Sequence, residues 1–249
     1  MIIIKNKQSI IKMARAGQEL AQIFEILKNF IKPGISTLSI DSFIAQELKK
    51  RDMVSKTVGH RGYKHSSCIS VNNEVVHGVP LVAKVLQNGD LVKVDVCASW
   101  NGYCADMARC FFIGETIDIN IRKLVDVAYE SLNIGIAQSV PGNHLSDISA
   151  AIQVYIEKNG FGVVRDFAGH GIGKSMHEEP ELPNFGKPGK GPILRAGMTL
   201  AIEPMITVGN YEVFVAEDGW TVKTRDHSWA AHVEDTVLIT EQGPRVLTR

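Results

Sequence analysis

The chain has 249 residues, 45% of them hydrophobic, which is typical of one large globular domain. Lys plus Arg and Asp plus Glu each total 27, so the formal net charge of zero argues against a general binder of nucleic acids or anionic membranes. No stretch approaches the ~18 apolar residues of a membrane span. The apolar run near residue 1 is too short for a signal peptide, so we expect a cytoplasmic protein.

The predicted elements follow one order twice. Apolar residues recur at helical spacing from about residue 9 to 31, and Pro33-Gly34 ends that helix. A second helix is predicted from about Ser36 to the charged run at 49–52, and strand-like segments follow at 68–76 and 90–98. Helices are then predicted at 120–138 and 145–158, and strands at 199–206 and 233–239.

The two halves also share short sequence matches. Pro33-Gly34 recurs as Pro141-Gly142, Leu38-Ser39 as Leu145-Ser146, and Gly59-His60 as Gly169-His170, at shifts of 108, 107 and 110 positions. Three matches in one register indicate an ancient duplication. No linker rich in Pro, Gly or Ser separates the halves, so the sequence predicts a single domain over residues 1–249 with internal pseudo-symmetry.

The cysteines carry no disulfide signature. Cys68, Cys97, Cys104 and Cys110 form no C-x-x-C pair and stand in apolar or strand-like sequence. We therefore expect reduced thiols.

A hairpin is predicted around Asn101-Gly102, the dipeptide that a two-residue type I′ turn prefers. In that register the numbers of paired residues sum to 203, and Asp106 lies opposite Cys97. Since side chains alternate along a strand, Asp95 shares a sheet face with Cys97 and hence with Asp106. The two acids are then diagonal neighbours, roughly 7–8 Å apart.

These two acids allow more than one interpretation. A solvated sheet face is a poor one, because Asp95 stands in the apolar segment 91–96 and an unpaired buried carboxylate costs several kcal/mol or becomes protonated. A metal site and a structural ion pair both explain the pattern, and Asp95 and Asp106 alone do not choose between them.

The second half of the chain supplies further donors. Position 95 plus the shift of 108 is Glu203, another acid in an apolar strand, and Glu234 lies in the last predicted strand. His170 stands between glycines that permit a close approach to the backbone. Four carboxylates and one imidazole suit two bridged divalent cations, which activate water and polarise a carbonyl. This chemistry fits amide hydrolysis.

Asp95, Asp106, His170, Glu203 and Glu234, in this order and context, resemble the five metal ligands of the methionine aminopeptidases. The segments 70–80, 169–173, 177–180 and 202–205 carry the same resemblance, which extends over nearly the whole chain. It implies the α/β (α+β) pita-bread fold, in which two pseudo-symmetric halves surround a curved antiparallel sheet. Only 26 positions separate His177 from Glu203, which resembles the type I, bacterial-like branch.

The resemblance also implies an activity, namely removal of the initiator methionine by water activated at two divalent ions (Co, Fe, Mn or Zn). The expected substrates are peptides and nascent polypeptides with N-terminal methionine. The ribosome is a further candidate partner, and we expect a monomer.

The resemblance places His77, His177 and the ligand Glu203 in the catalytic machinery. His77 would contact the substrate and stabilise or protonate the reacting amide, and His177 would donate to the scissile carbonyl. Without the metal pattern they would be a turn residue and a surface residue.

Tyr63, Cys68 and Trp220 resemble the lining of the methionine pocket in this family. Without the metal pattern they would be ordinary core residues. The chain departs from the family at His60, where a tyrosine is usual, and at Met176, where a phenylalanine is usual. Both side chains are able to line a cavity, and a flexible Met adapts to irregular gaps.

Two other functions compete with this one. A prolidase or Xaa-Pro aminopeptidase shares the fold and ligand set but lacks the string at residues 73–78 and usually carries a further domain. A catalytically inactive pita-bread binding protein would typically have lost several ligands, whereas all five are present here.

Overall fold

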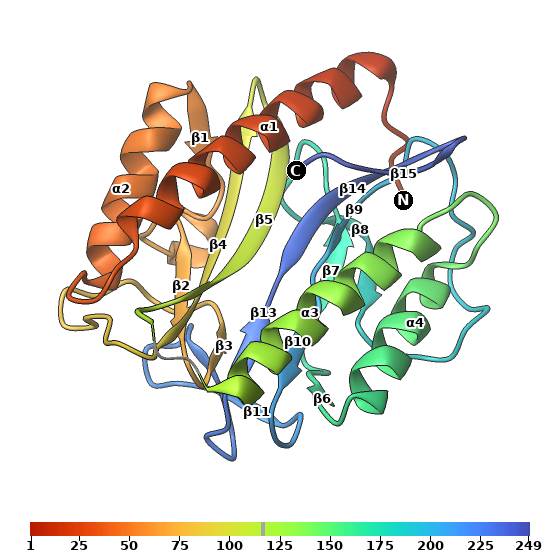
Figure 1. Cartoon of the computed structure of the whole chain (residues 1–249). Helices are drawn as coiled ribbons and strands as arrows, with labels where there is room; N and C mark the ends of the chain where they lie inside the picture. The colour runs from red at the N-terminus through yellow and green to blue at the C-terminus, as the bar shows by residue number, and fades with distance from the viewer. Residues whose placement is uncertain (116–117) are drawn as a thin grey trace.

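Four helices cover one face of a curved sheet in the computed structural model, which describes residues 1–115 and 118–249 (Figure 1). The helices are α1 (Lys7–Phe30), α2 (Thr37–Lys50), α3 (Ile119–Gln138) and α4 (Leu145–Lys158). Each lies within two residues of its predicted bounds. Among the described residues, no helix combines the length and hydropathy that a membrane crossing requires.

Helix boundaries follow from local capping. The Asn6 side chain accepts a hydrogen bond from the Ser9 amide at 2.9 Å and begins α1, and the Ser36 hydroxyl accepts one from Ser39 at the start of α2. Along α1 the buried side chains recur every three or four residues, as at Leu20, Ile23 and Leu27. This stripe packs α1 against the sheet.

The main sheet is antiparallel and runs in the order β1-β4-β5-β14-β9-β7-β8, with β2 beside β4 and β15 beside β14. Its strands are β1 (Met53–Ser55), β2 (Cys68–Val71), β4 (Leu91–Trp100), β5 (Tyr103–Phe112), β7 (Ala168–Gly171), β8 (Glu178–Pro183), β9 (Thr199–Ile202), β14 (Glu234–Thr240) and β15 (Gly243–Val246).

Two three-stranded sheets complete the fold. One is β13-β10-β6 and the other β11-β12-β3. Their strands are β3 (Glu74–Val76), β6 (Gly162–Val163), β10 (Met205–Thr207), β11 (Val213–Val215), β12 (Val222–Thr224) and β13 (Ala230–His232). A short 3-10 helix, η1 (His60–Gly62), lies between β1 and β2.

Alternation along the strands separates the core from the opposite face. On β4, Val94 and Val96 belong to the apolar cluster beneath α1 and α2, while the intervening Asp95 points to the other face. A second cluster lies beneath α3 and α4. Because both clusters use the helix-covered face of the sheet, the opposite face is left to form a cavity.

The hairpin prediction is confirmed. Asn101 and Gly102 have φ of 46° and 77°, as a type I′ turn requires, and Cys97 pairs with Asp106. Two predicted strands are each divided in two. The segment 68–76 turns at Asn72, where φ is 52°, and the segment 199–206 leaves the strand conformation after Ile202. The four cysteines are free thiols, as expected.

The pseudo-symmetry is visible in the backbone hydrogen bonds. Gly34 donates to Leu86 at 2.8 Å, and Gly142 donates to Leu194 at 3.0 Å, so donor and acceptor are both displaced by 108 positions. Thus the Pro-Gly match identified in the sequence reflects equivalent positions of the two halves.

The third sequence match is wrong. In the first half Lys93 pairs with Ser70, and in the second half Ala201, 108 positions later, pairs with His170. Ser70 therefore occupies the place equivalent to His170, whereas His60 lies in the 3-10 helix outside this pairing. A match of two residues arises by chance more often than an equivalent pairing of strands does, so the strand pairing identifies the equivalent positions.

Candidate metal centre and substrate cavity

A cavity of about 370 Å3 opens on the sheet face that the helices leave free. The structure brings all twelve site residues proposed from the sequence into its lining. They are His60, Tyr63, Cys68, His77, Asp95, Asp106, His170, Met176, His177, Glu203, Trp220 and Glu234.

Five adjacent strands deliver the five candidate ligands. In sheet order they are Asp95 on β4, Asp106 on β5, Glu234 at the start of β14, Glu203 directly after β9, and His170 on β7. Donor atoms of Asp106, His170 and Glu234 all lie within 4.8 Å of one another. The Nε2 of His170 is 3.6 Å from Oε1 of Glu203. Thus residues more than a hundred positions apart form one cluster.

The buried carboxyl groups of the cluster form an environment that a cation would stabilise. Burial is the main cause that raises the pKa of Asp106 to about 6. Burial first, and then the charge of Asp106, raise the pKa of Asp95, Glu203 and Glu234 well above their ordinary values. The Oε1 of Glu234 has no hydrogen-bond partner among the described residues. Divalent ions would neutralise these carboxylates and occupy the free oxygen, so the residues fit a metal centre.

His170 presents a neutral imidazole to the cluster. Its Nδ1–H donates to the Gly171 carbonyl at 2.9 Å, which leaves the Nε2 lone pair free. Burial lowers its pKa to about 4. The flanking glycines allow the neighbouring strands, rather than a ligand, to approach closely. A Cβ at Gly169 would clash with the backbone carbonyl of Ala201, and one at Gly171 with that of Glu179.

Three further histidines stand around the cluster. His177 packs edge-to-face on His170, with ring centroids 4.4 Å apart, and on His60 at 5.4 Å. Burial lowers the pKa of His77 to about 4 and is the main cause that lowers the pKa of His177. Neutral imidazoles therefore face the carboxylates at neutral pH.

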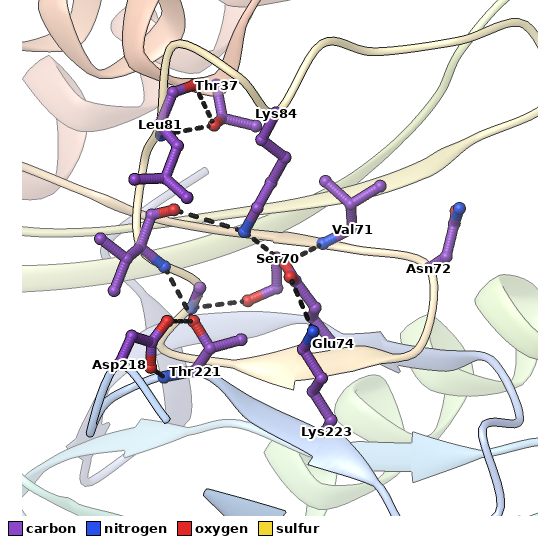
Figure 2. Close-up of polar contacts among 12 residues, drawn as sticks. Thr37, Ser70, Val71, Asn72, Glu74, Leu81, Lys84, Asp218, Thr221 and Lys223 are labelled. Atoms are coloured by element: carbon purple, nitrogen blue, oxygen red, sulfur yellow. Dashed lines mark hydrogen bonds and ion pairs between the residues drawn. The ribbon is translucent and has the colours of Figure 1, made fainter. Parts of the chain in front are cut away.

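A polar network holds the backbone that follows His77, and Figure 2 shows the contacts that Ser70 and Thr221 make in it. His77 itself has φ of 57°, unusual for a residue other than glycine. Next to it, Gly78 N–H donates to the Ser70 hydroxyl at 3.0 Å, and Val79 N–H donates to the Thr221 hydroxyl at 3.2 Å. These contacts hold the two residues after His77 and thereby orient its imidazole.

The same network reaches the cavity wall on the other side. Asp218 accepts from the Thr221 hydroxyl at 2.6 Å (Figure 2). It also accepts from the amides of Trp220 and Thr221. Lys84 donates to Val79 O at 3.3 Å and pairs with buried Glu74 at 2.9 Å. The network thus connects Trp220 to the backbone of the His77 loop.

Tyr63, Cys68 and Trp220 form an apolar wall. The rings of Tyr63 and Trp220 meet edge-to-face with centroids 4.9 Å apart, and the Tyr63 hydroxyl donates to the Ser67 carbonyl at 3.0 Å. Cys68 is buried and pairs with Asp95 across the β2–β4 ladder. The wall therefore lies directly beside the carboxylates.

Sequence reasoning missed His232. Its side chain is buried, and donor atoms of Glu203, His232 and Glu234 lie within 4.8 Å of one another. Burial lowers the pKa of His232 to about 3. A signal was present, because alternate residues of an extended segment share a face and His232 precedes Glu234 by two positions.

Comparison with known proteins agrees with this geometry. The model of metallopeptidase family M24 matches residues 11–241. The chain is 48% identical to a methionine aminopeptidase of Clostridium acetobutylicum, over 100% of this chain and 99% of that protein. It is 44% identical to methionine aminopeptidase 1 of Bacillus subtilis, with complete coverage of both chains.

Solved structures show the same fold. A methionine aminopeptidase from Thermotoga maritima superposes with a TM-score of 0.98 at 44% identity, and each chain is covered completely. An Xaa-Pro dipeptidase from Bacillus anthracis has a similar fold, with a TM-score of 0.79 and 24% identity over 99% of this chain and 62% of its own. The pita-bread prediction is confirmed. The chain belongs to metallopeptidase family M24 and, within it, to the type I, bacterial-like methionine aminopeptidases.

Proposed function

We propose that this protein hydrolyses the peptide bond after an N-terminal methionine. The observation that carries the proposal is the convergence of five predicted ligands, from five adjacent strands, beside a cavity of about 370 Å3 with an apolar wall. The natural substrates would be nascent polypeptides in the cytoplasm. The enzyme would be a monomer and would act at or near the ribosome.

Asp95, Asp106, His170, Glu203 and Glu234 would hold two divalent ions. The oxygen-rich set with an imidazole suits Co, Fe, Mn or Zn, and availability selects among them. When bound, such ions supply activated water at neutral pH and polarise the scissile carbonyl. The strands of the main sheet would keep these carboxylates in place for the ions.

His77 and His177 would act on the substrate rather than on the ions. Both are neutral at pH 7, since burial lowers their pKa, and a neutral imidazole offers an N–H donor. His177 would donate to the scissile carbonyl oxygen, where negative charge develops, and His77 to the reacting amide. The contribution of each histidine to catalysis depends on the orientation of its imidazole, which the surrounding contacts maintain.

The apolar wall would select the first residue. Tyr63, Cys68 and Trp220 offer no charged partner, so an unbranched apolar side chain is accepted and a charged one is excluded by its desolvation cost. His60 and Met176 complete the lining and would adjust its shape.

The deciding experiment measures release of the first residue from Met-Ala-Ser and from an Xaa-Pro tripeptide, each with and without added divalent ions. We expect metal-dependent methionine release and little cleavage before proline. Preferential cleavage before proline would support a prolidase instead. Absence of any peptidase activity in protein that binds two ions would support a binding function.

A further inference from the structure

His232 has an unusual environment for a buried histidine. It is the last residue of β13, its side chain is 2% exposed, and its Nε2 has no hydrogen-bond partner among the described residues. A buried polar atom without a partner costs roughly 1–3 kcal/mol, so such an atom calls for an unseen partner. The Oε2 of Glu203 lies 3.4 Å from this nitrogen.

That separation fits two ligands of one ion better than a hydrogen bond. A charge-assisted N–H···O bond spans about 2.7–2.9 Å. Two donors bound to the same divalent ion at about 2.1 Å, at tetrahedral or octahedral angles, lie roughly 3.0–3.4 Å apart. The other oxygen of Glu203, Oε1, lies 3.6 Å from His170 Nε2. The Glu203 carboxylate therefore has one imidazole near each oxygen.

Two overlapping donor groups follow from this arrangement. One comprises Asp106, His170 and Glu234, and the other comprises Glu203, His232 and Glu234. Each group holds one imidazole, and Glu234 belongs to both. A carboxylate common to two donor groups is the usual bridge of a dinuclear site.

We propose that His232 is a sixth ligand of the metal centre and binds the ion held by Glu203 and Glu234. The inference rests on the proposed function only in requiring that the centre bind metal. A second imidazole would make the site softer than one of four carboxylates and one imidazole, which favours zinc and cobalt over manganese.

The primary test is X-ray absorption spectroscopy of the full chain loaded with zinc or cobalt, because outer-shell scattering counts the bound imidazoles. We expect two imidazoles per two ions in the wild type. Replacing His232 by Leu should remove one imidazole and weaken binding of one ion by more than about 100-fold in calorimetry, beyond the 10–100-fold typical of residues that only support a ligand.

Two further variants serve as references. His170→Gln should also lose one imidazole, whereas His77→Gln should retain both, because His77 has the same side chain but belongs to neither donor group. The His232→Gln variant keeps an N–H donor. If it bound both ions with wild-type affinity, His232 would be a hydrogen-bonding partner of Glu203 and the inference would be wrong.

The outcomes separate the two proposals. Wild-type protein with two ions but one bound imidazole overturns the role of His232 and leaves the peptidase assignment intact. Wild-type protein that binds no divalent ion overturns both. If His232→Leu fails to fold, the imidazole count of the wild type still decides.

Discussion

Single residues of the cluster make the most direct tests. Asp106 lies in the centre of the sheet, where its charge raises the pKa of three neighbouring carboxyl groups. We expect Asp106→Asn to keep the fold, since the side chains have the same shape, but to lose a metal ion and reduce methionine release by more than about 100-fold. Metal content and turnover are measured together. Asp126→Asn, on the exposed face of α3, is the matched control. Full turnover by Asp106→Asn in limiting metal would contradict the assignment.

His77 and His177 should behave differently from the ligands. Replacing either by Ala removes an N–H donor near the substrate, so turnover should fall roughly 10²–10⁴-fold. Neither residue belongs to the donor groups of the cluster, and metal stoichiometry should therefore stay at two ions per chain. A parallel loss of metal and activity would show that a ligand had been mistaken for a substrate contact.

A pH prediction tests the buried charge of Asp106. Its folded pKa, about 6, exceeds its ordinary value of 3.8, so at intermediate pH the unfolded chain has lost a proton that the folded protein keeps. The contribution of Asp106 to the free energy of unfolding thus decreases as pH rises through this window and levels off above pH 6. The total change is about 3 kcal/mol in metal-free protein.

The measurement is urea unfolding of the wild type and Asp106→Asn in excess chelator at pH 4 to 7. His77, His170 and His232, whose lowered pKa values act in the opposite direction, are common to both proteins. The variant also removes one cause that raises the pKa of Asp95, Glu203 and Glu234, which changes the difference between the two proteins in the same direction as the loss of Asp106 itself. Relative to the wild type, Asp106→Asn should become more stable as pH rises. A difference independent of pH would show that Asp106 ionises normally.

At the scale of elements, the segment joining β3 to β4 depends on two threonine hydroxyls. Thr221 binds Val79 N–H near His77, and Thr37 binds Leu81 N–H at 2.9 Å farther along (Figure 2). Thr221→Val would leave the Val79 amide without its partner and cost roughly 1–3 kcal/mol of stability. We expect kcat to fall about tenfold, because the backbone beside His77 loosens.

Thr37→Val, at the start of α2, provides the matched control, since it removes a hydroxyl that contacts the same segment at a greater distance from the cavity. Its stability should fall by a similar amount while kcat stays near wild type. Equal losses of kcat in the two variants would mean that general loosening, rather than the position of His77, determines the rate.

At the scale of the whole molecule, specificity comes from segments far apart in the chain. Tyr63, Cys68 and Trp220 form the wall only after both halves have folded. A methylene changes binding by roughly 1–3 kcal/mol, whereas a buried charge costs far more. Tripeptides beginning with norleucine should be cut appreciably and those beginning with Lys or Glu hardly at all. Formyl-Met peptides should resist, because a formylated amine has no basic lone pair to offer the metal ions. Comparable rates for Lys-first and Met-first peptides would contradict this wall.

The sequence by itself determined whatever depends on neighbours along the chain. The hairpin register followed from Asn101-Gly102 and the two-residue period of a strand, and it correctly put Asp95 and Asp106 on one face. The four helices followed from their apolar spacing and stop signals. The ligand set followed from the family resemblance, which summarises tertiary information that no local rule contains.

Only the tertiary structure decided which side chains meet. It showed that Ser70, rather than His60, is the structural counterpart of His170, and it brought His232 to 3.4 Å from Glu203. Local periodicity specifies the face on which a side chain lies. It does not specify which distant strand pairs beside it, because that choice is made by burial of the two apolar clusters and by backbone hydrogen bonds between segments a hundred residues apart.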